Sequence, residues 1–126
     1  MNLVDSCGWL EYFANGPNAD FFAPAIENTA QLIVPSLCLF EVFKRILQQR
    51  SESEALRAVA LMRQGRSIEL DDHLALSAAR LSVDTRLALA DSIILCAARQ
   101  YQAVLWTQGA HFAAISGVRY IAKTSA

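Results

Sequence analysis

Short apolar runs alternate with longer amphipathic stretches along this 126-residue chain, and this alternation limits the folds that it can adopt. The runs have the length of buried strands, and the stretches between them have helical spacing. Strands joined by helices pair in parallel, and right-handed connections place helices on both faces of the sheet. We therefore predict an α/β fold with three α/β/α layers and a five-stranded parallel sheet, as a single domain over residues 1–126. The expected strands are residues 1–5, 32–35, 67–70, 103–107 and 118–121.

Residues that favour helix starts mark most of the expected helices. Ser6 and Ser36 directly follow apolar runs and are candidate N-caps. Ser51 and Glu54 have the spacing of a capping box, and Asp71 is a further candidate N-cap. The expected helices are residues 6 to about 14, 18–28 with Pro24 as a kink or a later start, 36 to about 50, 52 to about 65, 72 to a loop at 83–86, and 90–101.

The composition indicates a globular domain with a large core. Hydrophobic residues make up 54% of the chain and charged residues 18%, which argues against disorder. Eleven basic and 12 acidic residues exclude a strong overall attraction to nucleic acid, although a local basic patch remains compatible with them. The longest uncharged apolar stretch, residues 29–40, is too short to span a membrane, and no signal-like segment precedes it, so we expect a cytoplasmic protein. Cys7, Cys38 and Cys96 lack metal-site spacing and are expected to be buried free thiols.

Three carboxylates stand alone in apolar surroundings. Asp5, Glu41 and Asp91 are each the only charged residue in a run of at least ten. Each follows a strand directly or lies in the first turns of the next helix, so a parallel sheet brings all three to one edge. Each also has an ordinary structural explanation. Asp5 can cap a strand end, Asp91 can interact with a helix dipole, and Glu41 can reach solvent or pair with Lys44 or Arg45.

A group of carboxylates without His or Cys favours Mg²⁺ or Mn²⁺ over zinc. Such an ion can activate water and stabilise the charge that develops during cleavage of a phosphodiester. Ser6 and Thr107 supply hydroxyl groups at the same edge. These hydroxyls can orient a water molecule or a phosphate, or they can serve only as a helix cap and a strand end.

The chain resembles the PIN-domain nucleases, and specifically the VapC-type toxins of bacterial toxin–antitoxin pairs. The matching pieces are residues 3–6 (LVDS), 34–36 (VPS) with 40–42 (FEV), 89–94 (LADSII), 105–107 (LWT) through Phe112, and 117–120 (GVRY). The resemblance implies a PIN-like sheet with a central first strand, RNA endonuclease activity, and Mg²⁺ or Mn²⁺ at Asp5, Glu41 and Asp91. Thr107 matches the family's hydroxyl position. The resemblance also implies a homodimer and an antitoxin partner, with no role for a membrane.

The chain departs from the family pattern after the fourth expected strand. The family has an acid two residues after its threonine, whereas this chain has Gly109. Three acids can still hold one ion, so weakened activity is expected. His111 stands nearby and is interpreted as a surface or packing residue, with phosphate contact or metal ligation as the alternative.

Six basic residues between positions 44 and 66 form a locally basic helical pair, which is either a contact surface for RNA, with Lys44 and Arg45 nearest the acids, or an ordinary solvated face. Trp9, Tyr12 and Trp106 are more consistent with core or dimer contacts than with base stacking. Two other functions remain open. One is a PIN-fold module that binds RNA or antitoxin without cleavage, and the other is a phosphoacceptor domain. The second needs a lysine beside the acids, and Lys123 lies beyond the last strand.

Overall fold

The computed structural model describes residues 1–124 and confirms the predicted fold class. Five parallel strands form one sheet in the order β3-β2-β1-β4-β5. The strands are β1 (Asn2–Val4), β2 (Leu32–Pro35), β3 (Arg66–Ile68), β4 (Val104–Thr107) and β5 (Val118–Tyr120). The helices are α1 (Ser6–Phe13), α2 (Ala19–Glu27), α3 (Ser36–Gln49), α4 (Glu52–Met62), α5 (Asp72–Thr85) and α6 (Leu89–Gln100), with short 3₁₀ turns η1 (Thr29–Gln31) and η2 (Ala110–Phe112).

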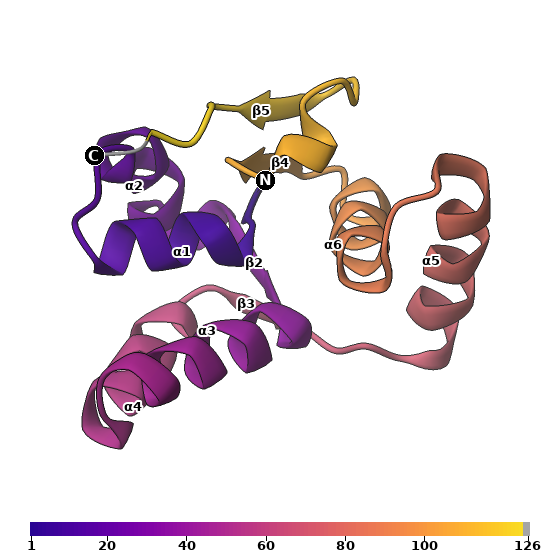
Figure 1. Cartoon of the computed structure of the whole chain (residues 1–126). Helices are drawn as coiled ribbons and strands as arrows, with labels where there is room; N and C mark the ends of the chain where they lie inside the picture. The colour runs from indigo at the N-terminus through magenta and orange to yellow at the C-terminus, as the bar shows by residue number, and fades with distance from the viewer. Residues whose placement is uncertain (125–126) are drawn as a thin grey trace.

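The first strand lies at the centre of the sheet, as the sequence resemblance implied. Leu3 pairs with Ile33 of β2 on one side and with Leu105 of β4 on the other. Helices α1 to α4 cover one face of the sheet, and α5 and α6 cover the other (Figure 1). The central strand is therefore enclosed on all sides, and the residue that follows it is held at the carboxyl edge.

The core is built where the helices pack onto β1. Leu3 and Val4 are completely buried, and Trp9 and Phe22 pack over them from α1 and α2. Burying a side chain of this size contributes about 1.5–3 kcal/mol. Gly8 allows the close approach, because a Cβ atom there would lie 2.7 Å from Val4 and from the Phe22 ring. The start of α1 is consequently fixed against the central strand.

The helix caps agree with the sequence in two places and differ in two. Ser51 accepts a hydrogen bond from the amide of Glu54 at 3.1 Å, and Asp71 is the N-cap of α5, so both predicted caps are confirmed. The prediction for Ser6 was wrong, because Asp5 caps α1 and accepts from the amide of Ser6 at 2.7 Å. The prediction for Ser36 was also wrong. Pro35 holds the N-cap position of α3, and Ser36 is the first helical residue.

Several boundaries also differ from expectation, and α4 ends at Met62 rather than near residue 65. β3 starts at Arg66 rather than Ser67 and ends at Ile68, because its first two residues lie exposed at the edge of the sheet and give no apolar alternation. A loop was expected at residues 83–86, but α5 continues to Thr85. Arg86 is its C-cap, and the positive φ of 62° at Arg86 stops the helix. Pro24 was expected to kink the second helix or to delay its start. α2 starts at Ala19 and Pro24 lies inside it, so the start is not delayed. No helix in the described part of the chain combines the length and apolar character needed to cross a membrane.

Candidate active site

Asp5 is a buried carboxylate at the carboxyl end of the central strand. Its amide donates to the carbonyl of Trp106 at 3.0 Å, which extends the pairing of β1 with β4 by one residue. Its side chain is 7% exposed and forms no ion pair within residues 1–124. Burial raises the pKa of Asp5, and the negative charge of Asp91 raises it further, while hydrogen bonds from Thr107, Ser6 and Cys7 lower it. The charged form of Asp5 is therefore unfavourable in the isolated protein.

Thr107 ties the end of β4 to Asp5. Its hydroxyl is completely buried, donates to Asp5 Oδ2 at 2.8 Å, and accepts from the amide of Gly109 at 2.9 Å. Both hydrogen-bonding roles of the hydroxyl are thus occupied by the protein. Thr107 is placed to orient Asp5, which is a different role from the direct positioning of water that the sequence allowed.

Glu41 and Ser6 join the starts of two helices. The Ser6 hydroxyl donates to Glu41 Oε1 at 2.6 Å, which connects the first turn of α1 to the second turn of α3. Neither Lys44 nor Arg45 forms an ion pair with Glu41 among the residues that the structure describes. Pairing of Glu41 on its own helix face is therefore not observed, and its other ordinary explanation, access to solvent, stays open because Glu41 is half-buried.

Asp91 reaches the same region from the other face of the sheet. It lies in the first turn of α6, and its Oδ2 is 3.1 Å from Nδ1 of His111, which lies on η2. The His111 side chain is 78% exposed, whereas that of Asp91 is 23% exposed. The interpretation of His111 as a surface residue is confirmed, and the structure adds a direct contact with a candidate acid.

Gly109 stands where the sequence resemblance expects a fourth acid. A Cβ atom at this position would lie 3.2 Å from Thr107 Oγ1 and 3.7 Å from Asp5 Oδ2. The backbone has φ of −75° and ψ of 120°, a conformation that any residue adopts. A side chain at position 109 would therefore begin beside Asp5 without backbone strain.

The donor set suits a hard divalent cation. The candidate ligands are carboxylate oxygens, and Asp5 is buried, feels the charge of Asp91, and has no cationic partner in the described part of the chain. In their present rotamers, no three His, Cys, Asp or Glu side chains within residues 1–124 surround a common point closely enough to share an ion. Glu41 and Asp91 are directed toward Ser6 and His111 instead. Asp5, Glu41 and Asp91 fit the ion by their chemistry, and their role as joint ligands stays a prediction.

Cys7 is a member of this region that sequence reasoning missed. Its thiol is half-buried and donates to Asp5 Oδ2 at 3.5 Å, and the same distance separates Sγ from Thr107 Oγ1. Burial, and next the charge of Asp5, raises the pKa of Cys7 to about 11. The sequence offered one signal that Cys7 lies near the acids, because a single residue separates it from Asp5. Cys38 and Cys96 are buried as expected, and Cys7 is buried only in part.

The basic residues occupy exposed positions beside the acids. Lys44 and Arg45 lie one turn beyond Glu41 and line a hollow of about 390 Å³ with it. Trp9 and Trp106 are core residues, which confirms that base stacking was the weaker interpretation for them. Lys123 was expected to be badly placed relative to the acids. It lies beyond β5, as expected, and lines a cavity together with Cys7, whereas no contact joins it to Asp5, Glu41 or Asp91 among the described residues.

The comparison with protein families decides which fold family this is. The family model described as PIN domain matches residues 3–118, which include Asp5, Glu41, Asp91 and Thr107. This chain belongs to the PIN domain family. The Gly109 position therefore lies within the matched part of a PIN domain. No significant match was found among curated protein sequences.

Solved structures share this PIN fold over nearly their whole length. A toxin–antitoxin complex from Klebsiella pneumoniae is 22% identical, with 94% of this chain and 95% of that chain covered and a TM-score of 0.78. VapC20 from Mycobacterium tuberculosis, described as a sarcin–ricin loop cleaving toxin, is 15% identical, with coverage of 94% and 98% and a TM-score of 0.78. VapBC2 from Rickettsia felis, bound to a promoter DNA fragment, is 12% identical, with coverage of 96% and 97% and a TM-score of 0.73. At these identities the similarity shows the fold alone.

Proposed function

We propose that this PIN-domain protein is a metal-dependent endoribonuclease and acts as the toxin of a toxin–antitoxin pair. The observation that carries the proposal is the buried Asp5 carboxylate at the carboxyl edge of the sheet, whose pKa the charge of Asp91 raises further and which has no cationic partner in residues 1–124. Ligands of open parallel sheets bind at this edge. The sarcin–ricin loop cleaving toxin with the same fold supports RNA as the substrate class.

In this proposal Asp5, Glu41 and Asp91 hold Mg²⁺ or Mn²⁺. When bound, the ion supplies an activated water and stabilises negative charge on the phosphodiester. Thr107 holds Asp5 in one orientation through its hydrogen bond of 2.8 Å. Ser6 holds Glu41 in the same way and would release it toward the ion. The sequence predicted that Ser6 contacts the water or the phosphate directly. We propose instead that Ser6 acts on the substrate by positioning Glu41.

Lys44 and Arg45 are proposed to bind the phosphate backbone of the substrate. Both are exposed, and both line the hollow that Glu41 also borders. Cations that border the same hollow as Glu41 can attract a polyanion without occupying the metal position. Of the other basic residues, Arg50 pairs with Glu54 at 3.8 Å. The proposed backbone contact is therefore centred on α3.

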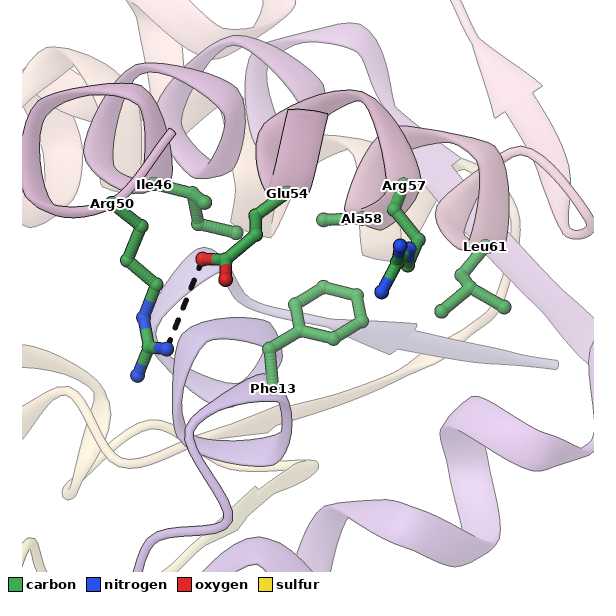
Figure 2. A pocket seen from close by; sticks show the side chains of 7 residues that line it. All are labelled: Phe13, Ile46, Arg50, Glu54, Arg57, Ala58 and Leu61. Carbon is green, nitrogen blue, oxygen red and sulfur yellow. Dashed lines mark ion pairs between the residues drawn. The ribbon is translucent and has the colours of Figure 1, made fainter. Parts of the chain in front are cut away.

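The antitoxin partner is a proposal that a second cleft supports. Figure 2 shows this cleft between α1, α3 and α4, with Phe13 facing Ile46 and Leu61 and with Arg57 at its rim. Its volume is about 210 Å³. Glu54 pairs with Arg50 in this cleft, so a protein segment that carries apolar side chains and an acid for Arg57 would complement it. The solved toxin–antitoxin complexes with this fold support a partner of that kind.

A homodimer is also proposed. Three large apolar side chains, Leu76, Val83 and Leu89, are more than 70% exposed on or beside α5 and α6. Exposed apolar side chains gathered on one part of a surface favour association. A sedimentation-velocity measurement should give the mass of a dimer, and Leu76→Asp should shift it to that of a monomer.

The alternative is a PIN-fold module that binds RNA or antitoxin without cleavage. The specific observation that favours it is Gly109, because no side chain extends from this position toward Asp5. One carboxylate fewer weakens the attraction for a divalent ion. We propose attenuated cleavage as the first hypothesis and keep the binding module as the second.

The test is RNA cleavage measured as a function of Mn²⁺ concentration. We expect cleavage to require the ion and to be lost in Asp5→Asn, which keeps the shape of the side chain and removes its charge. Asp20→Asn is the matched control, because Asp20 is an exposed acid on α2. Cleavage that persists in EDTA, or full activity in Asp5→Asn, would contradict the proposal.

A further inference from the structure

A cavity of about 310 Å³ adjoins the acids on the α1 side, and Arg45 is the one residue that it shares with the RNA contacts proposed above. It is lined by α1, by α3, by Gln108 after β4, and by Lys123 in the C-terminal segment. We call it the side cavity. Cys7 forms the end nearest the acids, because its Sγ lies 3.5 Å from Asp5 Oδ2. The side cavity is thus connected to the edge of the sheet where cleavage is proposed.

The side cavity carries two cations that come from distant parts of the chain. Arg45 of α3 and Lys123 of the C-terminal segment both line it. Neither forms an ion pair among the described residues. Together with the acid Glu11, they give the lining of the side cavity a net charge of +1, and this charge favours an anion in the cavity. Their convergence in one cavity indicates a negatively charged ligand.

The polar side chains around these cations leave donors available. Glu11 is the one acid that lines the side cavity, and its carboxylate accepts a hydrogen bond from the backbone amide of Asn18 at 2.7 Å. Gln108 is buried, and its Oε1 accepts from Asn18 Nδ2 at 3.0 Å, so its Nε2 is the end that remains to donate. Gln49 adds a second amide. Two cations and two amide groups match the oxygen atoms of a phosphate.

We propose that the side cavity binds a phosphate of the RNA strand next to the phosphate that is cleaved. The inference rests on the proposed function and adds to it a path for the substrate. The strand would run from the acids past Cys7 and place one neighbouring phosphate between Arg45 and Lys123. Lys123 then fixes the position of the strand, while the acids act on the bond that is broken.

The first experiment measures binding without cleavage. All variants carry Asp5→Asn and are kept at one Mg²⁺ concentration, and a short fluorescent single-stranded RNA is titrated at several KCl concentrations. Lys123→Ala should weaken binding roughly tenfold and reduce the slope of log K against log[salt] by about 0.7, the value for one phosphate contact on a single strand. Arg80→Ala, an exposed cation on α5, is the charge-matched control and should leave both quantities unchanged.

The second experiment uses Cys7 as a reporter inside the side cavity. Alkylation of Cys7 by iodoacetamide is followed by mass spectrometry, with Cys7→Ser to identify the labelled site. Bound RNA should slow alkylation at least fivefold, and Lys123→Ala should remove most of this protection at the same RNA concentration. An acidic peptide such as polyglutamate serves as the competing ligand and should protect Cys7 less than RNA does.

The outcomes separate this inference from the proposed function. If the wild-type protein cleaves RNA but Lys123→Ala binds like Arg80→Ala, the side cavity is not a phosphate site and the nuclease proposal stands. The inference also fails if RNA binds and leaves Cys7 alkylation unchanged. Stronger protection by the acidic peptide would assign the side cavity to a partner protein and overturn the inference. Protection by RNA in a protein that never cleaves would support the side cavity and refute the nuclease.

Discussion

The replacement Gly109→Asp tests whether this chain lacks one carboxylate of a metal site. The new Cβ would lie 3.7 Å from Asp5 Oδ2 and in tight contact, 3.2 Å, with Thr107 Oγ1. Because the backbone at position 109 is in an ordinary extended conformation, the variant should fold. Its carboxylate would stand close to that of Asp5, and without a cation the two would repel each other.

The expected magnitude follows from the spacing. Two carboxylates about 5 Å apart repel by about 3 kcal/mol at an effective dielectric constant of about 20. In EDTA, Gly109→Asp should therefore unfold at a lower urea concentration than Gly109→Asn, which has the same shape without the charge. In Mn²⁺ the order should reverse, and 3 kcal/mol of extra attraction corresponds to about 100-fold tighter ion binding.

The assays are urea unfolding with and without Mn²⁺, calorimetric Mn²⁺ titration, and RNA cleavage. Equal Mn²⁺ affinity in Gly109→Asp and Gly109→Asn would refute the reasoning, because the added charge would then not face the ion. Cleavage by Gly109→Asp beside an inert wild-type protein would identify the present chain as a binding module. Cleavage by both proteins, with the faster rate in Gly109→Asp, would identify an attenuated nuclease.

Three further predictions follow from the same residues. Burial raises the pKa of Asp5 above 3.8, so the metal-free fold should lose stability as pH rises through that raised pKa; Asp5→Asn should remove this loss in urea unfolding, and an unchanged pH profile would contradict it. Thr107→Val removes one hydrogen bond from Asp5 and leaves the amide of Gly109 without a partner, and should destabilise the protein by about 1–3 kcal/mol, whereas Thr107→Ser should cost less. Because the pKa of Cys7 is raised to about 11, its alkylation rate should rise roughly tenfold per pH unit beyond pH 9, and a plateau near pH 9 would show an ordinary thiol.

The edge that holds the acids could be predicted because it follows from local patterns. Apolar runs identify the strands, and parallel pairing places every strand end on one side. These two patterns were sufficient to predict that Asp5 and Asp91 lie at this edge. The caps at Ser51 and Asp71 were equally local, since each is set by hydrogen bonds within one turn. Ser6 was assigned wrongly because two residues able to cap stand side by side, and packing of α1 on β1 decides between them.

Contacts between distant segments were not predictable from the sequence. Ser6 meets Glu41 across 35 residues, and His111 meets Asp91 across 20, although neither pair follows a spacing rule. Lys123 reaches the cavity beside Cys7 because the segment after β5 runs back toward α1, where Asn18 donates to the carbonyl of Ala122. These positions depend on how the chain ends pack, and an apolar pattern carries no information about them.

Hydroxyl groups, which carry no charge, hold two of the three acids. Thr107 binds Asp5 and Ser6 binds Glu41, while Asp91 lies 3.1 Å from the imidazole of His111. A hydroxyl orients a carboxylate without neutralising its charge, so the burial of charged Asp5 remains unfavourable until a cation binds. An ion present at 100 times its dissociation constant would stabilise the fold by about 2.7 kcal/mol. Asp5, which is proposed for cleavage, is therefore also a residue that lowers stability in the metal-free protein. It follows that activity lost in a variant at this edge has to be measured together with its stability, with and without the ion.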